Sequence, residues 1–257
     1  MSIGESIRKS QVWKSIFRHP APTDRRNRVV VMLTNVFLHL HPVSVRKSGI
    51  NLSYTWCMGG LTFFLFLVET ITGVLLMFYY RPTLEHAYND ILELRDVTTL
   101  GILRELHRWG AHAMVIAIWL HMYRVFLTGS YKPPREFNWG VGVILLVLTL
   151  LLSFTGYLLP WDQLAIWAIT VGSNMARATP FLGHEGPGAK FLNVGGVDLI
   201  TSGSDARYLL LGGRFVGETT LLRFYVLHCI ALPLAVALLI AVHFWRVRKD
   251  GGISGAL

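Results

Sequence analysis

Four histidines in two apolar stretches have the type and the spacing to hold a metal cofactor. His107 and His121 lie 14 residues apart, and His228 and His243 lie 15 apart. Either spacing makes about four turns of an ideal helix, so the members of each pair share roughly one face. Two imidazoles that face each other across a helical bundle are natural axial ligands for a haem iron. A single histidine of this kind is as readily a core residue bonded to a neighbouring helix, but two matching pairs favour haem.

The levels of the four histidines predict two stacked sites. Each pair spans about 21 Å along its helix, which is most of the hydrocarbon thickness of a bilayer. Because the two stretches run in the same direction, His107 is level with His228, and His121 is level with His243. We therefore expect two haems, one near each side of a membrane. Pro233 should bend the second helix and absorb the one-residue difference in spacing.

The other six histidines are expected not to bind a metal. His112 follows His107 by five residues, which rotates it by about 140° from the ligand face of an ideal helix. The remaining five lie outside the apolar stretches: His19, His39, His41, His86 and His184.

Four glycines repeat the ligand spacing on two further apolar stretches. Gly59 and Gly73 are 14 residues apart, and so are Gly142 and Gly156. A residue without a side chain lets a flat macrocycle approach the backbone closely. Glycine is also common where membrane helices pack together, so each pair by itself has a second explanation.

Two arginines flank the first pair of histidines. Arg104 precedes His107 by three residues, and Arg124 follows His121 by three. Each is one turn nearer a membrane surface than its histidine, where it could pair with the propionates of a haem. Either could instead be an interfacial arginine whose charged head reaches water.

The elements that position these residues are four apolar stretches, each long enough to cross a bilayer as a helix. The composition agrees, since 53% of the 257 residues are hydrophobic, 15% are charged, and the mean hydropathy is +0.47. We expect an all-α, polytopic four-helix membrane bundle that holds two stacked haems. The helices are predicted from about Tyr54 to Tyr80, Leu106 to Leu127, Trp139 to Leu159 and Leu221 to Trp245.

The distribution of charge predicts which side of the membrane each end faces. Four crossings put both termini on one side, where fifteen of the 24 basic residues lie with only four acids. The other side has nine basic residues and ten acids. By the positive-inside rule, both termini lie on the cytoplasmic, electrically negative side, here the n side. Topology thus accounts for the net charge of +9, and no aromatic–basic motif supports nucleic-acid binding.

Two polar segments flank this membrane domain of residues 51–257. Residues 1–50 form a basic n-side arm, of which the first 28 are expected to be flexible or to lie on a surface, and no signal sequence is recognised. Residues 162–220 form a long connection on the opposite, positive (p) side, with a Gly-rich run at 183–217. A connection of this length is usually functional or disordered.

Three other residues in or near the helices could carry chemistry. Cys57 and Cys229 are too few and too far apart for a disulfide framework or a thiolate metal cage. A lone cysteine near a helix end is usually a buried small residue. Glu69, in the middle of the first helix, needs a polar partner and fits either structural hydrogen bonding or proton transfer.

A series of short motifs follows in order from about Asn51 to the C-terminus. In this order they resemble cytochrome b6, the four-helix N-terminal half of cytochrome b in quinol-oxidising complexes of the bc1 and b6f type. They are Cys-Met-Gly-Gly at 57–60, Thr-Gly at 72–73, Phe-Tyr-Tyr-Arg-Pro at 78–82, His-Arg-Trp at 107–109, Thr-Gly at 128–129 with Lys-Pro at 132–133, Thr-Gly-Tyr at 155–157, Leu-Pro-Trp-Asp-Gln at 159–163, Arg-Phe-Tyr at 223–225 and Gly-Ile-Ser-Gly at 252–255.

The resemblance implies a role for each candidate ligand. His107 and His228 would hold the p-side haem b, and His121 and His243 the n-side haem b. The spacing of 15 on the last helix resembles the b6 branch.

The resemblance also implies a third haem. Cys57 lies where the b6 branch attaches a c-type haem on the n side through a single thioether. Arg248 lies near the arginine that the family is thought to use for the propionates of this haem, although an extra glycine at 251 or 252 shifts the local alignment. Cys229 matches no ligand of the family.

The activity implied by the resemblance is quinol oxidation near the p side. One electron would pass to a Rieske iron–sulfur protein and the other through the two b haems to n-side quinone, coupled to proton translocation. Residues 159–163 and the helical stretch through Met175 would line part of the quinol pocket, but no catalytic base can be named.

The chain is expected to be one electron-transfer subunit that is inactive alone. It contains no Rieske motif, no Cys-x-x-Cys-His site and no Pro-Glu-Trp-Tyr. The implied partners are a separate subunit with the C-terminal half of cytochrome b, a Rieske protein, a c-type cytochrome or its equivalent, and membrane lipid, in a dimeric complex.

Departures from the family pattern leave two other classes of protein open. They are an N-terminal extension, an insertion within about residues 183–213, and Glu69, where related chains often have a neutral amide. The rivals are a dihaem quinone-linked membrane anchor of another dehydrogenase, and a non-redox transporter with a histidine proton relay. We expect location in an energy-conserving membrane, the bacterial inner membrane.

Overall fold

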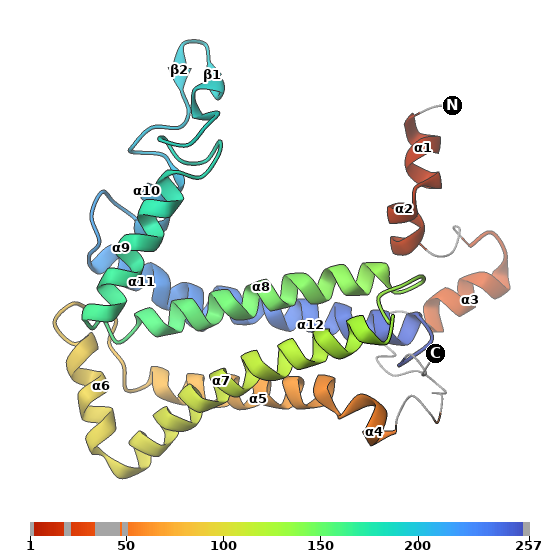
Figure 1. Ribbon diagram of the computed structural model, residues 1–257, viewed down its shortest axis with the longest axis horizontal. Coiled ribbons are helices and arrows are strands. Elements are labelled where there is room, and N and C mark those ends of the chain that lie inside the picture. Colours follow the sequence, from red (N-terminus) through yellow and green to blue (C-terminus); the bar gives the residue numbers. More distant parts are fainter. Residues whose placement is uncertain (1–2, 18–21, 34–46, 48–50, 254–257) are drawn as a thin grey trace. The chain divides into compact units, whose positions relative to one another are not determined.

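The computed structural model describes residues 3–17, 22–33, 47 and 51–253 (Figure 1). Its helices include four that are long and apolar enough to cross a membrane. This confirms that the four predicted apolar stretches form long helices. They are α5 (Met58–Met77), α7 (Thr98–Leu127), α8 (Glu136–Leu158) and the continuous run Glu218–Lys249, which consists of α11 (Glu218–Val226), a π-helical turn η3 (Leu227–Ala231) and α12 (Leu232–Lys249).

Helix α7 begins eight residues before the predicted start at Leu106. The added residues 98–105 mix polar and apolar side chains, and at their end Glu105 binds both Arg104 and Arg108. The Glu105–Arg108 pair, three positions apart on the helix surface, stabilises α7 at this level. Hydropathy therefore detects only the part of α7 that suits lipid.

The π-helical turn explains the difference of one residue between the two histidine spacings. His228 lies within η3, where Leu232 N–H bonds to the carbonyl of Leu227, five residues back. A π turn holds one more residue than an α turn, so it returns the chain to nearly the same face after 15 residues. Pro233 follows Leu232 and has no N–H, so it cannot donate the usual α-helical hydrogen bond to the residue four positions back. The predicted adjustment at Pro233 is therefore made by the wide turn that precedes it.

The chain divides into two compact units, and each of the four long helices contributes a segment to both. The first unit contains His121 and His243, and the second contains His107 and His228. The first comprises Met1–Leu67, His112–Thr149 and Leu234–Leu257, and the second Val68–Ala111 and Leu150–Pro233.

The N-terminal part of the first unit contains the short helices α1 (Ile3–Lys9), α2 (Gln11–Ile16), α3 (Arg25–Leu33) and α4 (Leu52–Thr55). Helix α2 packs at the start of α8, where Phe137 N–H donates to Ser15 Oγ at 2.9 Å. Arg246 at the end of α12 donates to the carbonyl oxygens of Ser15 and Ile16. It therefore caps the negative end of α2. The arm is thus tied to the membrane helices at α2.

Arg246 is the buried charged residue in the contact between α2 and the end of α12. Its side chain is 1% exposed, lies over the ring of Phe137 at 4.8 Å, and is 3.4 Å from the carboxylate of Asp250. A buried guanidinium needs such partners, because an unpaired charge away from water is costly.

We expect Arg246→Ala to release α2. Hydrogen bonds from a charged donor contribute about 1.5–3 kcal/mol each, so trypsin should cut at Lys9 and Lys14 at least about tenfold faster. The measurement is a time course of limited proteolysis of the membrane-embedded protein. Lys249→Ala, one turn further along the same helix, is the matched control and should leave the rate near that of the parent.

The connection of residues 162–217 in the second unit is ordered by short elements. These are α9 (Gln163–Arg177), the 3-10 turn η2 (Ala189–Phe191), the antiparallel strands β1 (Asn193–Val194) and β2 (Val197–Asp198), and α10 (Ala206–Leu211). Leu158, Ile169 and Phe224 form a small buried core with Ala165 and Leu211, which joins α8, α9, α10 and α11. The same unit contains α6 (Ala87–Asp96), whose Asp90 holds Arg81 by two side-chain hydrogen bonds.

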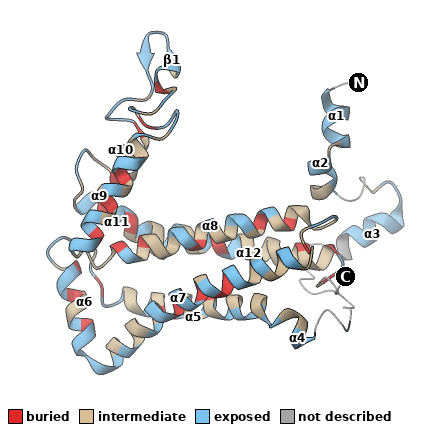
Figure 2. Ribbon diagram, in the orientation of Figure 1, coloured by how far each residue is buried: buried red, intermediate tan, exposed pale blue. Residues whose placement is uncertain are grey.

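Large apolar side chains are exposed along the four long helices (Figure 2). Examples from three of them are Phe64, Ile116 and Leu238, each more than half exposed. Contiguous apolar surface of this kind requires lipid or another apolar partner, because it is too costly to leave in water.

Candidate functional site

The candidate ligands come together in two pairs. The ring centroids of His107 and His228 are 6.2 Å apart, and those of His121 and His243 are 6.4 Å apart. Two metal–imidazole bonds of about 2 Å, with about 1 Å from each nitrogen to its ring centre, give a separation of roughly 6 Å. Each pair therefore has the separation that two axial ligands of one metal require.

Hydrogen bonds at Nδ1 orient both rings of the His107–His228 pair. Thr72 Oγ lies 2.9 Å from His107 Nδ1, and Thr155 Oγ lies 3.2 Å from His228 Nδ1. Each hydroxyl donates its own proton to a carbonyl of its helix, so it accepts from the imidazole. His228 Nδ1 is also 3.1 Å from the carbonyl oxygen of Leu152. A proton held on Nδ1 leaves Nε2 free to bind a metal.

The sequence interpretation did not identify these two threonines as functional. Their signal is a repeated dipeptide, because Thr72 directly precedes Gly73 and Thr155 directly precedes Gly156. The hydroxyl and the missing side chain thus reach the same histidine from neighbouring positions.

Each of the four spaced glycines lies against a different histidine. A Cβ added at Gly59 would lie 3.3 Å from the ring of His121, and one at Gly73 would lie 3.2 Å from the ring of His107. On α8, a Cβ at Gly142 would lie 3.9 Å from His243, and one at Gly156 would lie 2.5 Å from His228. The glycines therefore leave space beside the ligands, which is the property expected of a macrocycle site.

Arg124 has an environment that suits a carboxylate. Its guanidinium lies over the ring of Tyr54 at 4.3 Å, and its Nε and Nη2 are buried without a hydrogen-bond partner among the described residues. Buried donors of this kind are rare unless a ligand or water satisfies them. A haem propionate beside His121 fits this requirement.

The other two predicted arginines lie in different surroundings. Arg104 already binds Glu105 at 2.6 Å, so a propionate would have to share it. Arg248 is only partly buried, whereas Arg246 is the fully buried arginine at this end of α12. Arg246 follows His243 by three residues, as Arg124 follows His121, and this register is the signal that could have identified it.

Cys57 lies in a sharp connection between α4 and α5. Trp56 and Cys57 both adopt left-handed backbone conformations, with φ of 52° and 50°. This conformation is energetically unfavourable for residues other than glycine, and such residues are enriched at functional positions. The thiol is exposed, unlike the partly buried Cys229. A lone cysteine near a helix end is usually buried, and Cys57 is an exception.

The described histidines that were predicted not to bind a metal have other surroundings. His112 is exposed, His86 lies 3.8 Å from the carboxylate of Glu85, and His184 contacts Asp205. His19, His39 and His41 lie outside the described residues. Across the described part of the chain, no group of three or more His, Cys, Asp or Glu side chains could hold a metal ion.

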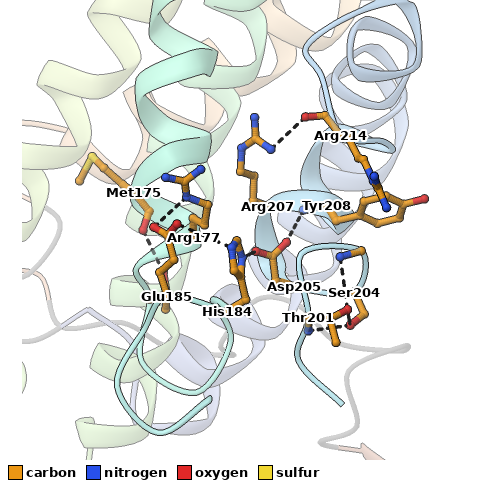
Figure 3. Close-up of polar contacts among 12 residues, drawn as sticks. Met175, Arg177, His184, Glu185, Thr201, Ser204, Asp205, Arg207, Tyr208 and Arg214 are labelled. Carbon is orange, nitrogen blue, oxygen red and sulfur yellow. Dashed lines mark hydrogen bonds and ion pairs between the residues drawn. The ribbon is translucent and has the colours of Figure 1, made fainter. Parts of the chain in front are cut away.

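A polar cluster joins the end of α9 to α10 (Figure 3). His184 Nδ1 contacts Asp205 Oδ2, and Arg177 Nε lies 2.9 Å from Glu185 Oε2. Asp205 is 1% exposed and caps α10 by accepting from Tyr208 N–H at 2.8 Å. Burial by itself would raise the pKa of Asp205, but the bonds from His184 and Tyr208 outweigh it and lower the pKa.

We expect Asp205→Ala to loosen residues 178–211, which include α10. Loss of an N-cap costs about 1 kcal/mol, and loss of the His184 contact adds to it, so amide exchange there should be about tenfold faster at neutral pH. Because the folded pKa is lowered, the stabilisation exists above the unfolded pKa of about 3.9 and is lost as pH falls further. Hydrogen exchange with mass spectrometry checks both effects. Glu218→Ala, which removes an exposed acid at the start of α11 and outside this segment, is the control and should not change exchange in it.

Comparison with known proteins agrees with this geometry. The family model for cytochrome b/b6/petB matches residues 43–186 and 197–251. The unmatched residues 187–196 fall within the Gly-rich run, where the structure has η2 and β1. The chain is 40% identical over 209 residues to cytochrome b6 of Prochlorococcus marinus (strain SARG), which covers 81% of this chain and 85% of the relative.

Two further relatives give the same result. Cytochrome b6 of Synechocystis sp. (strain Kazusa) is 40% identical over 81% of this chain and 84% of its own length. A solved chain of a hyperthermophilic respiratory Complex III superposes with a TM-score of 0.67 at 25% identity, over 90% of this chain. This chain spans 55% of the length of that one. The chain, with its four membrane-capable helices and two histidine pairs, therefore belongs to the cytochrome b/b6 family of transmembrane haem proteins of electron transport.

Proposed function

We propose that this chain is the dihaem cytochrome b subunit of a bc- or b6f-type quinol oxidoreductase. In this role it takes an electron from quinol oxidised on the p side and delivers it to quinone on the n side, with coupled proton translocation. The observation that carries the proposal is the repetition of one arrangement, in which two facing imidazoles are each backed by a glycine, once in each unit. Protein relatives named cytochrome b6 and Complex III support it.

Four histidines would bind the two haem irons through Nε2. His107 and His228 would hold the p-side haem b, and His121 and His243 the n-side haem b. When bound, two b haems supply one-electron carriers at two depths of the membrane, and moving one charge across 100 mV costs about 2.3 kcal/mol. Gly59, Gly73, Gly142 and Gly156 would leave room for the macrocycles.

The chain's own residues would also hold the cofactors in orientation. Thr72 and Thr155 keep the proton on Nδ1 of the p-side imidazoles, so that Nε2 stays available. Arg124 would pair with a propionate of the n-side haem through its buried donors. Arg104 would do the same on the p side in competition with Glu105, and Arg248 would serve the third haem.

Helix α9 offers an apolar surface for the p-side quinol pocket. Its buried face, at Ala165 and Ile169, packs on the core of the second unit. The opposite face exposes Leu164, Trp167 and Met175 at helical spacing. An exposed apolar stripe needs a partner, which would be the quinol and the subunit with the C-terminal half of cytochrome b.

A third, c-type haem would be bound to the n side through a thioether from Cys57. Support comes from the exposure of Cys57 and from its left-handed backbone conformation just before α5. The full complex would contain a Rieske protein, which accepts the first electron of each quinol, and a c-type cytochrome or its equivalent. The two protons of the quinol would be released on the p side, and quinone reduction would take up protons on the n side.

The test is a redox-resolved absorption spectrum of the complex purified through a tag on this chain, with a denaturing gel stained for haem peroxidase. The proposal predicts two b-type α-bands that titrate separately, reduction by quinol, and co-purification of a Rieske protein. Two b haems with hydrogenase or formate dehydrogenase subunits would favour the dehydrogenase anchor instead. A haem-free chain would overturn the proposal.

A further inference from the structure

Glu69 is an acidic residue in the middle of membrane helix α5, and the proposed mechanism does not use it. Its side chain is only 15% exposed. A carboxyl group at this depth is costly, so it needs a specific polar partner. The partner in this structure is a candidate haem ligand, because Glu69 Oε2 lies 3.1 Å from His107 Nδ1.

Glu69 and Thr72 reach the same atom of His107 from the same helix. The hydroxyl of Thr72 is 2.9 Å from Nδ1 and donates its proton to the carbonyl of Val68, so it can only accept from the imidazole. Three residues separate Glu69 from Thr72, which puts both on one face of α5. Nδ1 of His107 thus has a hydroxyl oxygen and a carboxyl oxygen beside it, at 2.9 and 3.1 Å.

Helix α7 has a space that receives this carboxyl group. Gly110 is buried one turn after His107, and a Cβ built there would overlap Glu69 Oε1. Any larger residue at this position would push the carboxyl group away from the imidazole. Gly110 is outside the 14-residue glycine pattern, so the macrocycle does not explain it.

The other three candidate ligands have different surroundings. His228 Nδ1 has a hydroxyl and a carbonyl oxygen as its neighbours, and neither is charged. Within the described ranges, no carboxylate pairs with His121 or His243. Among the four, His107 alone has a carboxyl group next to Nδ1 in the part of the chain that the structure describes, and a carboxyl partner of a histidine makes the imidazole a stronger donor to its metal.

We propose that Glu69 is a positioning residue that lowers the midpoint potential of the p-side haem by strengthening His107 as a ligand. A stronger donor stabilises the ferric iron more than the ferrous iron, so the haem is harder to reduce. Since the n-side pair lacks such a carboxylate among the described residues, the difference favours electron transfer from the p side to the n side. The inference rests on the proposed function, because it assumes that His107 binds haem.

The test is an anaerobic redox titration of both b haems in the purified complex, followed at the α-bands. Glu69→Gln keeps the shape and an acceptor oxygen but removes the carboxyl group. We expect the p-side haem to become easier to reduce, with about a tenfold higher ratio of reduced to oxidised haem at a fixed potential, equal to about 59 mV for one electron. The n-side haem is an internal reference and should not move.

Three further variants separate tuning from a structural effect. Gly110→Ala should shift the p-side haem in the same direction, because it displaces a carboxyl group that is still present. Glu69→Asp should return part of the shift. Glu93→Gln, which changes an exposed carboxyl group on α6 in the same unit, should leave both potentials unchanged.

Two outcomes would overturn the inference. One is an unchanged p-side potential in Glu69→Gln with both haems bound. The other is loss of the p-side haem from both Glu69→Gln and Gly110→Ala, since Glu69 would then be needed to form the site and not to tune it. A parent chain without haem would instead contradict the proposed function.

Discussion

His243→Leu should lower the b-haem content of the purified complex from about two per chain to about one. Leucine cannot bind iron, and a single imidazole is left at the His121 level. The second unit has its own pair, His107 and His228, with its own hydrogen bonds at Nδ1. We therefore expect the p-side haem to keep its spectrum and its potential while the other α-band is lost.

The measurement is haem content by pyridine haemochrome, together with a redox titration of the remaining band. His112→Leu is the matched control, because it makes the same substitution at an exposed position on α7 and should retain both haems. Two haems in the His243 variant would mean that the His121–His243 pair is not an axial ligand pair. Loss of both would show that the two sites do not form independently.

Cys57→Ser should abolish the haem-stained band of this chain on a denaturing gel. A thioether survives denaturation, whereas haem held only by histidines is released, so the stain reports the covalent bond alone. The structural reason for choosing Cys57 is its exposed thiol in the left-handed connection before α5. The two b haems should remain, since no ligand of either is changed.

Cys229→Ser is the matched control for this experiment. Cys229 lies in the π-helical turn beside His228 and is partly buried. The stained band should persist in this variant. A parent protein that shows b-haem spectra but no stained band would rule out the covalent haem and leave the two-haem function intact.

The sequence by itself determined where the four long apolar helices lie and which of their residues share a face. The spacings at His107–His121 and Gly59–Gly73 are local properties, because the helical period decides which residues share a face. Periodicity also separated His112 from the ligands, and the structure leaves its side chain exposed. Composition was sufficient to predict an integral membrane protein, since stretches of about 20 apolar residues are typical of membrane-spanning helices.

Only the tertiary structure decided which residues surround the ligands. The approach of Glu69 to His107 and to Gly110 depends on how α5 and α7 are rotated against each other, and no single-helix pattern contains that angle. Arg246 is a second case. Its position three residues after His243 could suggest a role, but its burial depends on the packing of α2 against the end of α12. Contacts between helices depend on how the helices pack and not on the period of one helix. The hydrogen bonds around the histidines could therefore be identified only from the structure.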